Sequence, residues 1–159
     1  MACDGQATME SRVVKRAARK VHRIHDGRVL AGFSGGTADG TTLLERLEAR
    51  LASHGTLRQA AVELSREWRT DRTLRRLEAV VVAASEEAVL LLTGEGDVIE
   101  PDDGLVGIGS GGGYAVSAAR ALLRHAQLSV TEVAKESLRI ASELDIYTND
   151  RVTLETLTW

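Results

Sequence analysis

The order in which apolar periodicities follow one another is the strongest constraint on how this chain can fold. The patterns predict two short strands, two helices, several strands, two more helices and a terminal strand pair. Elements of one kind therefore come in runs and do not alternate strictly. Such runs disfavour a doubly wound parallel sheet and favour antiparallel sheets with paired helices packed outside them. The expected fold class is α+β.

The predicted helices are indicated by leucine spacing and by capping residues. The first carries Leu43, Leu44, Leu47 and Leu51, and Gly55 is placed to end it. Thr56 and Gln59 have the spacing of a capping box at the start of the clearest amphipathic helix. Its apolar face carries Leu57, Ala60, Ala61, Leu64 and Trp68. An arginine-rich stretch closes this region: Arg69, Arg72, Arg75 and Arg76. Two later helices are predicted over 114–125 and 129–144, the second with a Ser129/Glu132 capping box.

The predicted strands are short apolar runs bounded by turn residues. A hairpin is expected across Asp26-Gly27, because this dipeptide favours the tight turns that join antiparallel strands. The runs predicted as strands cover 19–24, 28–34, 79–84, 88–92, 105–108, 146–148 and 151–154. We see no linker or repeat, so a single domain over residues 1–159 is expected.

Composition excludes several classes of protein. One cysteine in 159 residues rules out a disulfide scaffold and a cysteine-based zinc site. No apolar run approaches the ~20 residues of a membrane span. The net charge of −3 gives no basic field for nucleic acid. We therefore expect a cytoplasmic protein without membrane or nucleic-acid partners.

Two glycine-rich junctions between a strand and a helix are candidate binding sites. At Gly35-Gly36-Thr37, backbone N–H groups can stabilise an anion, and the alternative is a tight turn with Thr37 as helix cap. The run 109–113, Gly-Ser-Gly-Gly-Gly, lacks the Lys-Ser/Thr ending of a phosphate-binding loop. Its alternative interpretation is a turn that lets two elements approach closely. A phosphate- or small-molecule-binding α+β domain remains possible on these loops alone.

Other polar residues give no site by spacing. Asp4 and Lys20 are interpreted, on spacing alone, as a surface pair of little energetic value. The four histidines, His22, His25, His54 and His125, show no metal-ligand spacing.

Five blocks of residues, in order along the whole chain, closely resemble the HslV (ClpQ) peptidase family. They are Asp4-Gly5-Gln6-Ala7-Thr8, the block 31–39 (Ala-Gly-Phe-Ser-Gly-Gly-Thr-Ala-Asp), Glu67-Trp68-Arg69-Thr70-Asp71-Arg72, Ile108-Gly109-Ser110-Gly111-Gly112 and Ile146-Tyr147-Thr148-Asn149. The resemblance implies an N-terminal-nucleophile hydrolase related to proteasome β-subunits. Its fold is a four-layer αββα sandwich, two antiparallel sheets between helix pairs, here without the N-terminal strands.

The resemblance also implies an assembly and a partner. The family stacks two six-membered rings around a proteolytic chamber. A hexameric ATPase, HslU, unfolds protein substrates, threads them in and activates the peptidase, so no nucleotide is expected on this subunit.

The family's catalytic positions fall on four residues of this sequence. Lys20 matches a lysine beside the nucleophilic N-terminal threonine, where its charge lowers the pKa of the threonine α-amine, the general base. Asp4 matches the aspartate that orients this lysine. Gly35 matches the oxyanion donor, and Ser110 matches a serine that contacts the amine.

The threonine nucleophile itself is not found in the sequence, and Met1 stands where a returning strand would end. Thr8 has no free α-amine, and Cys3 is interpreted as a small buried residue. Either Met1 is internal to a protein that begins upstream with a threonine, or the chain is a non-catalytic ring subunit. The retained Asp4, Lys20 and Ser110 favour the first explanation. Residues 1–159 alone are expected to lack peptidase activity.

The resemblance further implies a monovalent cation site, typically for sodium, formed by backbone carbonyls near the last helix. Ser142, Asp145 and Thr148 fall on its positions. The first two differ from the expected Gly and Cys, which carbonyl ligation tolerates. A carboxylate at Asp145 either strengthens this site or merely caps the helix end.

Overall fold

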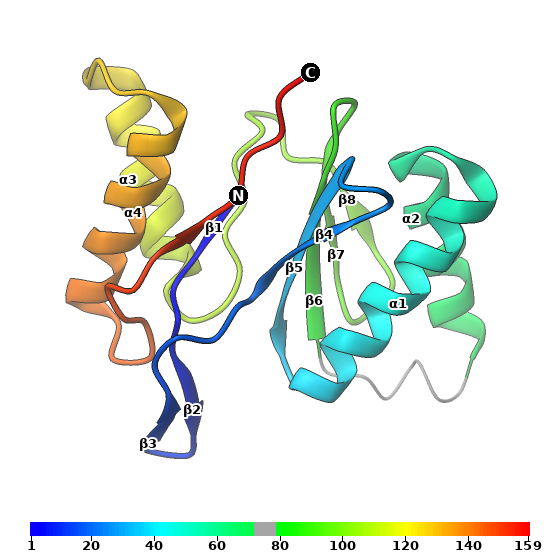
Figure 1. The fold of residues 1–159 in the computed structure, drawn as a ribbon, viewed down its shortest axis with the longest axis horizontal. Coiled ribbons are helices and arrows are strands. Elements are labelled where there is room, and N and C mark those ends of the chain that lie inside the picture. The colour runs from blue at the N-terminus through cyan, green and yellow to red at the C-terminus, as the bar shows by residue number, and fades with distance from the viewer. Residues whose placement is uncertain (72–78) are drawn as a thin grey trace. The chain divides into compact units, whose positions relative to one another are not determined.

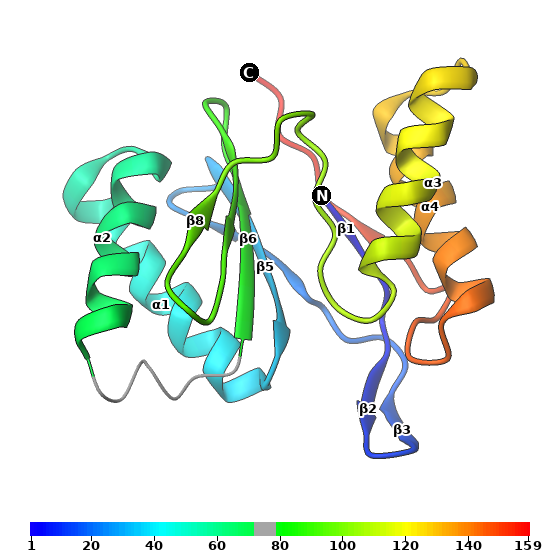
Figure 2. The ribbon, with the colours of Figure 1, turned by 180° about the vertical axis from the view of Figure 1, so that it is seen from behind.

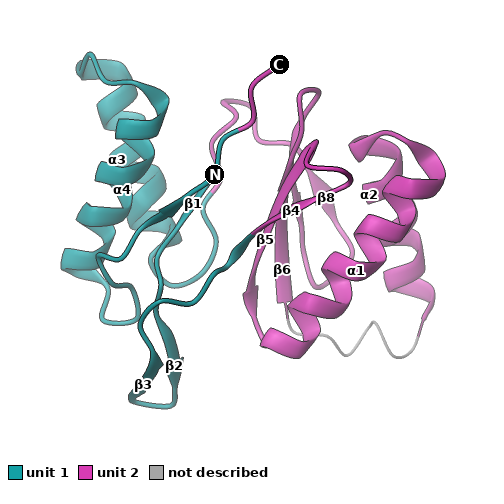
Figure 3. Ribbon diagram, viewed as in Figure 1, with its two compact units in different colours: residues 1–21, 107–156 teal, residues 22–106, 157–159 magenta. Residues whose placement is uncertain are grey.

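The computed structural model describes residues 1–71 and 79–159, which fall into two compact units (Figure 1). The first unit consists of residues 1–21 and 107–156, and the second of residues 22–106 and 157–159 (Figure 3). Both contain helices and antiparallel strand pairs, as expected for the α+β class.

The second unit is built on a five-stranded sheet in the order β4-β5-β6-β7-β8. These strands are β4 (Val21–Ile24), β5 (Val29–Gly35), β6 (Ala79–Ala84), β7 (Val89–Leu92) and β8 (Val98–Ile99). The hairpin predicted between β4 and β5 is confirmed. His25, Asp26 and Gly27 all have positive φ there, and the Gly27 N–H donates to the Ile24 carbonyl.

Two helices, α1 (Thr37–His54) and α2 (Leu57–Thr70), cover one face of this sheet (Figures 1 and 2). Helix α1 packs on β5 and β6, and α2 packs on β7 and β8. The apolar faces predicted from the leucine spacing are buried, and Trp68 is 1% exposed. The core of this unit is therefore the contact between the amphipathic faces and the sheet.

The first unit pairs two helices with short strands. Helices α3 (Gly112–His125) and α4 (Val130–Leu144) pack against each other. Strand β1 (Ala2–Cys3) pairs antiparallel with β9 (Thr153–Leu154), from the other end of the chain. Strands β2 (Ala7–Met9) and β3 (Arg12–Lys15) form a hairpin that the sequence patterns did not predict. Thr8 therefore lies in a strand.

The helix-capping predictions have different outcomes. The Ser129/Glu132 capping box is confirmed in both directions. Thr56 accepts from the Gln59 N–H, and Gly55 ends α1 in the left-handed conformation. Thr37 as helix cap is wrong, because Gly36 occupies the N-cap position of α1 and no side chain caps it. In the arginine-rich stretch, Arg69 lies in α2, whereas Arg72, Arg75 and Arg76 lie outside the described residues.

Two predicted strands are wrong. Residues 105–108 form no strand, because the Gly107 backbone packs directly against the first residue of α3. A Cβ on Gly107 would lie 2.4 Å from the Gly112 carbonyl oxygen. Residues 146–148 form a turn in which the Thr148 N–H donates to the Asp145 carbonyl. The expected terminal pair is absent from the described residues, because β9 pairs with β1.

In the described ranges, 1–71 and 79–159, no helix combines the length and the apolar character needed to cross a bilayer.

The packing of α2 leads to a stability prediction. Leu64 is fully buried, so Leu64→Ala should reduce the free energy of unfolding by about 3 kcal/mol, because it removes apolar contacts and leaves a cavity. Val62 lies on the same helix and is 42% exposed, so Val62→Ala should change it by less than about 0.5 kcal/mol. Urea denaturation followed by circular dichroism measures both. Equal losses would contradict the assigned helix face.

Candidate active site

Asp4 and Lys20 form an ion pair in the first unit. The Lys20 Nζ donates to Asp4 Oδ1 at 2.7 Å, and the Gln6 N–H donates to Asp4 Oδ2, also at 2.7 Å. The Asp4 residue is 9% exposed and the Lys20 side chain 30% exposed. Charge-assisted bonds in a partly buried place are stronger than those of exposed pairs. The expectation of an unremarkable surface pair is therefore wrong, and the contact implied by the family resemblance is present.

Glycine at position 5 permits the approach of the two segments that carry this pair. A Cβ on Gly5 would lie 2.5 Å from the Arg16 carbonyl oxygen and 3.0 Å from the Ala17 Cα. The Ala18 N–H also donates to the Gly5 carbonyl at 2.8 Å. The hairpin β2–β3 reverses the chain between these segments. Close backbone contact therefore brings Asp4 and Lys20 together.

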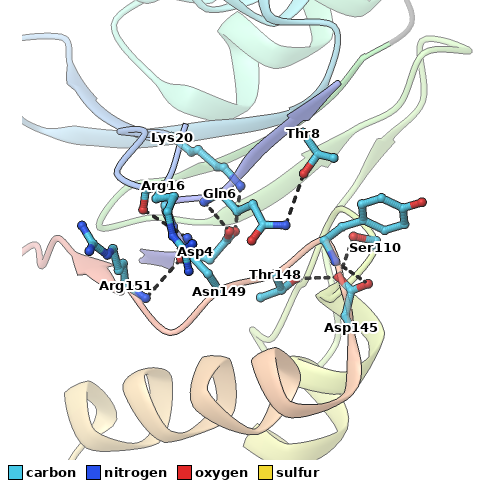
Figure 4. Close-up of polar contacts among 12 residues, drawn as sticks. Asp4, Gln6, Thr8, Arg16, Lys20, Ser110, Asp145, Thr148, Asn149 and Arg151 are labelled. Carbon is cyan, nitrogen blue, oxygen red and sulfur yellow. Dashed lines mark hydrogen bonds and ion pairs between the residues drawn. The ribbon is translucent and has the colours of Figure 1, made fainter. Parts of the chain in front are cut away.

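Two hydroxyl groups converge on Asp145, at the C-terminal end of α4 (Figure 4). Ser110 Oγ donates to Asp145 Oδ2 at 2.7 Å, and Thr148 Oγ1 donates to the same oxygen at 2.6 Å. We call these three residues the hydroxyl cluster. Gly111 makes room for it, because a Cβ there would lie 2.4 Å from Thr148 Oγ1. In the run 109–113, Gly111 and Gly112 thus serve close packing, as the alternative interpretation expected.

The pKa of the Asp145 carboxyl reflects opposing influences. Burial favours the neutral acid and raises the pKa. The hydroxyls of Thr148 and Ser110, the Tyr147 N–H and the charge of Lys20 all stabilise the carboxylate. The second set prevails, so the pKa lies below its ordinary value. The cluster therefore holds an ionised carboxylate with two hydroxyl donors.

Gly35 belongs to the second unit, where it ends β5 opposite Ala79. Its φ of 111° lies in the region that residues with a Cβ avoid. The sequence therefore needs glycine here for the backbone conformation at the junction of β5 and α1. The catalytic assignments of Gly35, Lys20, Asp4 and Ser110 stay predictions from the resemblance.

Cys3 lies half-buried in β1. Burial raises the pKa of its thiol above the ordinary value, although the N–H and the charge of Lys20 act in the opposite direction. A thiol with a raised pKa forms little thiolate and is a poor nucleophile. This favours the interpretation of Cys3 as a packing residue.

The three expected cation positions line one open depression of ≈ 530 Å³ in the first unit. Their side chains already have hydrogen-bond partners. Ser142 Oγ donates to the Arg139 carbonyl, and the Asp145 carboxylate accepts from the hydroxyls of Ser110 and Thr148. The backbone carbonyls of Ser142, Asp145 and Thr148 can still serve as ligands, since the Asp145 carbonyl, which accepts from the Thr148 N–H, keeps a second lone pair. Ser142 lies in the last turn of α4, where carbonyls lack intrahelical partners and the helix dipole favours a cation. This donor set fits a hard monovalent cation.

Among the residues that the structure describes, no three His, Cys, Asp or Glu side chains lie together so that they could hold a metal ion.

Gln6 and Asn149 lie in two of the blocks that resemble the family, but neither had a predicted role. Both are 8% exposed and hydrogen-bonded to segments distant in sequence. The position of Gln6 between Gly5 and Ala7 was the only sequence signal that Gln6 is buried, and Asn149, between Thr148 and Asp150, carried no such signal.

Comparison with known proteins identifies relatives over nearly the whole chain. Residues 1–157 match the proteasome subunit family. The ATP-dependent protease subunit HslV of Desulfovibrio desulfuricans is 54% identical over 159 residues, which are 99% of this chain and 90% of that protein. The crystal structure of eukaryotic HslV from Trypanosoma brucei aligns with a TM-score of 0.91 and 44% identity, over 97% of this chain and 90% of that one. The N-terminal-nucleophile hydrolase fold implied by the resemblance is confirmed. The single domain over residues 1–159 stays a prediction.

The lowered pKa of Asp145 has a consequence for stability. Because this pKa is lower in the folded than in the unfolded chain, the carboxylate stabilises the fold above about pH 4. That contribution is lost as the pH falls through the folded-state pKa. Asp145→Asn should therefore reduce the free energy of unfolding at pH 7 and have a smaller effect at pH 3. Chemical denaturation at a series of pH values measures the difference.

The exposed Asp150 provides the matched control for this experiment. Asp150→Asn should give a difference from the parent protein that varies little with pH. An effect of Asp145→Asn that is equally independent of pH would contradict the role assigned to the hydroxyl cluster.

Proposed function

Because the chain belongs to the proteasome subunit family, we propose that it is the peptidase subunit of an ATP-dependent cytoplasmic protease. The protease would degrade unfolded proteins supplied by an HslU-type ATPase. The likeness to HslV of Desulfovibrio desulfuricans, whose name includes ATP-dependent protease subunit, supports this proposal. The observation that carries it is the ion pair between Asp4 and Lys20, with the hydroxyl cluster in the same unit.

The proposed reaction is acyl transfer to a threonine hydroxyl. The hydroxyl oxygen attacks the scissile carbonyl while its proton passes to the threonine's own α-amine. That proton then goes to the leaving amine, and water hydrolyses the ester. The proposed nucleophile is therefore a threonine with a free α-amine, which in the family that this chain resembles begins the strand before the block Asp4–Thr8.

The residues of this chain would prepare that threonine. The Lys20 charge disfavours protonation of the amine, whose ordinary pKa is roughly 7.7–8.0. Asp4 holds Lys20 in place. The Ser110 hydroxyl donates a hydrogen bond to Asp145, which leaves the lone pairs of Ser110 Oγ available to accept a hydrogen bond from the amine. The Gly35 N–H would stabilise the oxyanion of the tetrahedral intermediate.

We further propose that the subunit assembles as a double ring of hexamers and that a sodium ion is its resident cation. The ion would be held by the backbone carbonyls of Ser142, Asp145 and Thr148. It would fix the turn that follows α4, which carries two members of the hydroxyl cluster.

Substitution of Lys20 tests the peptidase mechanism. In protein purified with its native N-terminus, Lys20→Met should reduce kcat/KM for a fluorogenic peptide by about 10²-fold or more, since the base loses the charge that tunes it. Lys15 is exposed on β3, and Lys15→Met should leave hydrolysis unchanged. Size-exclusion chromatography with light scattering confirms equal assembly. Undiminished hydrolysis by an assembled Lys20→Met particle would overturn the mechanism.

Two further measurements test the nucleophile and the partner. Intact mass and N-terminal sequencing of the active particle should show a leading threonine with a free amine. An inactive particle with the mass of residues 1–159 would instead support a non-catalytic ring subunit. Degradation of an unfolded protein should require both the ATPase and ATP.

Exchange of cations tests the sodium site. Replacement of sodium and potassium by choline at constant ionic strength should lower kcat and the melting temperature, because the carbonyls at the end of α4 lose their ligand. An equal kcat and an equal melting temperature in sodium, potassium and choline salts would contradict the cation proposal and leave the peptidase proposal intact.

A further inference from the structure

Two buried side-chain amides stand beside the candidate active site, and the proposed reaction uses neither. Gln6 and Asn149 are each 8% exposed, and both lie in the first unit (Figure 4). A buried amide that loses its partners leaves unsatisfied donors and acceptors, at a cost of about 1–3 kcal/mol. Their hydrogen bonds are therefore a strong constraint on the segments that they join.

Asn149 connects three backbone segments. Its Oδ1 accepts from the Gly5 N–H at 3.1 Å and from the Arg151 N–H at 3.1 Å. Its Nδ2 donates to the Arg16 carbonyl at 3.1 Å. Gly5 follows Asp4, and Arg16 lies four residues before Lys20. One amide group therefore holds both segments whose approach forms the ion pair.

Gln6 connects the Asp4 segment to the turn after α4. Its Nε2 donates to the Ile146 carbonyl at 2.9 Å and to Thr8 Oγ1 at 3.2 Å. Its backbone N–H donates to Asp4 Oδ2. Ile146 follows Asp145 directly, so this side chain ties the segment of the ion pair to the turn of the hydroxyl cluster.

We propose that Asn149 and Gln6 are positioning residues. Their side-chain amides hold the Asp4 carboxylate against Lys20 and fix the position of this ion pair relative to the hydroxyl cluster. This inference rests on the proposed function for its catalytic meaning. Asn149 extends from the segment after α4 to the backbone of Gly5 and Arg16, and Gln6 extends from the Asp4 segment to the backbone of Ile146. Loss of either should loosen the ion pair while the helices and the five-stranded sheet remain.

The chemistry at position 149 requires an amide. The site needs one acceptor for two N–H groups and one donor for a carbonyl. Aspartate supplies no donor, and alanine supplies neither. At position 6, methionine fills a similar volume without the donor, and the backbone N–H to Asp4 is retained. Asn149→Ala and Gln6→Met therefore remove the connections without adding charge.

The first test observes Lys20 directly and needs no peptidase activity. The chain has three lysines, Lys15, Lys20 and Lys135, so protein labelled with ¹³C-lysine gives three ε-methylene signals. Lys15→Arg and Lys135→Arg assign them. The Lys20 signal should stand apart from the other two, which belong to exposed residues. In Asn149→Ala and in Gln6→Met it should move toward them.

The second test measures catalysis on assembled particles. Both variants should lower kcat by about tenfold with KM within about twofold, because misplaced groups slow the chemical step more than they weaken binding. The acid limb of the kcat/KM profile should move to higher pH, because a less ordered Lys20 lowers the pKa of the amine less effectively. A purely structural role would reduce the amount of assembled particle without moving this limb.

Gln127 offers the matched control. It is exposed between α3 and α4, so Gln127→Glu should change neither the Lys20 signal nor the pH profile. A Lys20 signal that stays in place in both Asn149→Ala and Gln6→Met would overturn the inference. Failure of both variants to assemble would also overturn it, since the amides would then be required for the fold itself.

The two proposals fail in different ways. A wild-type particle without peptidase activity, or an Lys20→Met particle with full activity, would overturn the proposed function. The lysine signals would still report whether the amides position the ion pair.

Discussion

The Asp4 carboxylate is the centre from which the arrangement of the first unit can be understood. One of its oxygens accepts from Lys20 and the other from the Gln6 N–H. A nearly buried carboxylate tolerates little error in such contacts, because an unpaired charge in a poorly solvated place is costly. The hairpin β2–β3, the glycine at position 5 and the Asn149 amide all serve to bring its partners within reach.

The end of α4 gives the same unit a second fixed point. Asp145 closes the helix, accepts from the Tyr147 N–H that follows it, and receives the hydroxyls of Ser110 and Thr148. A residue that the sequence suggests as a cap or a cation ligand thus organises a polar cluster. Its lowered pKa results from these donors, which outweigh its burial.

Local signals predicted the helices well because their causes are local. Ser129 and Glu132 satisfy each other within one turn, and the faces of α1 and α2 follow from spacing alone. The strands were harder to predict, because a short apolar run becomes a strand only when a partner strand pairs with it. Residues 105–108 and 146–148 have no such partner in the described structure, whereas Ala2 and Cys3 find theirs at Leu154 and Thr153.

Residue patterns alone established the α+β class, the amphipathic faces and the glycine junctions, since each depends on neighbours within a few positions. The resemblance in five blocks added the pairing of Asp4 with Lys20, which spacing could not provide. The roles of Gln6 and Asn149, and the junction of β1 with β9, emerged from the folded chain. Their hydrogen bonds join groups up to 154 residues apart, as between Met1 and Glu155, and no local pattern encodes such contacts.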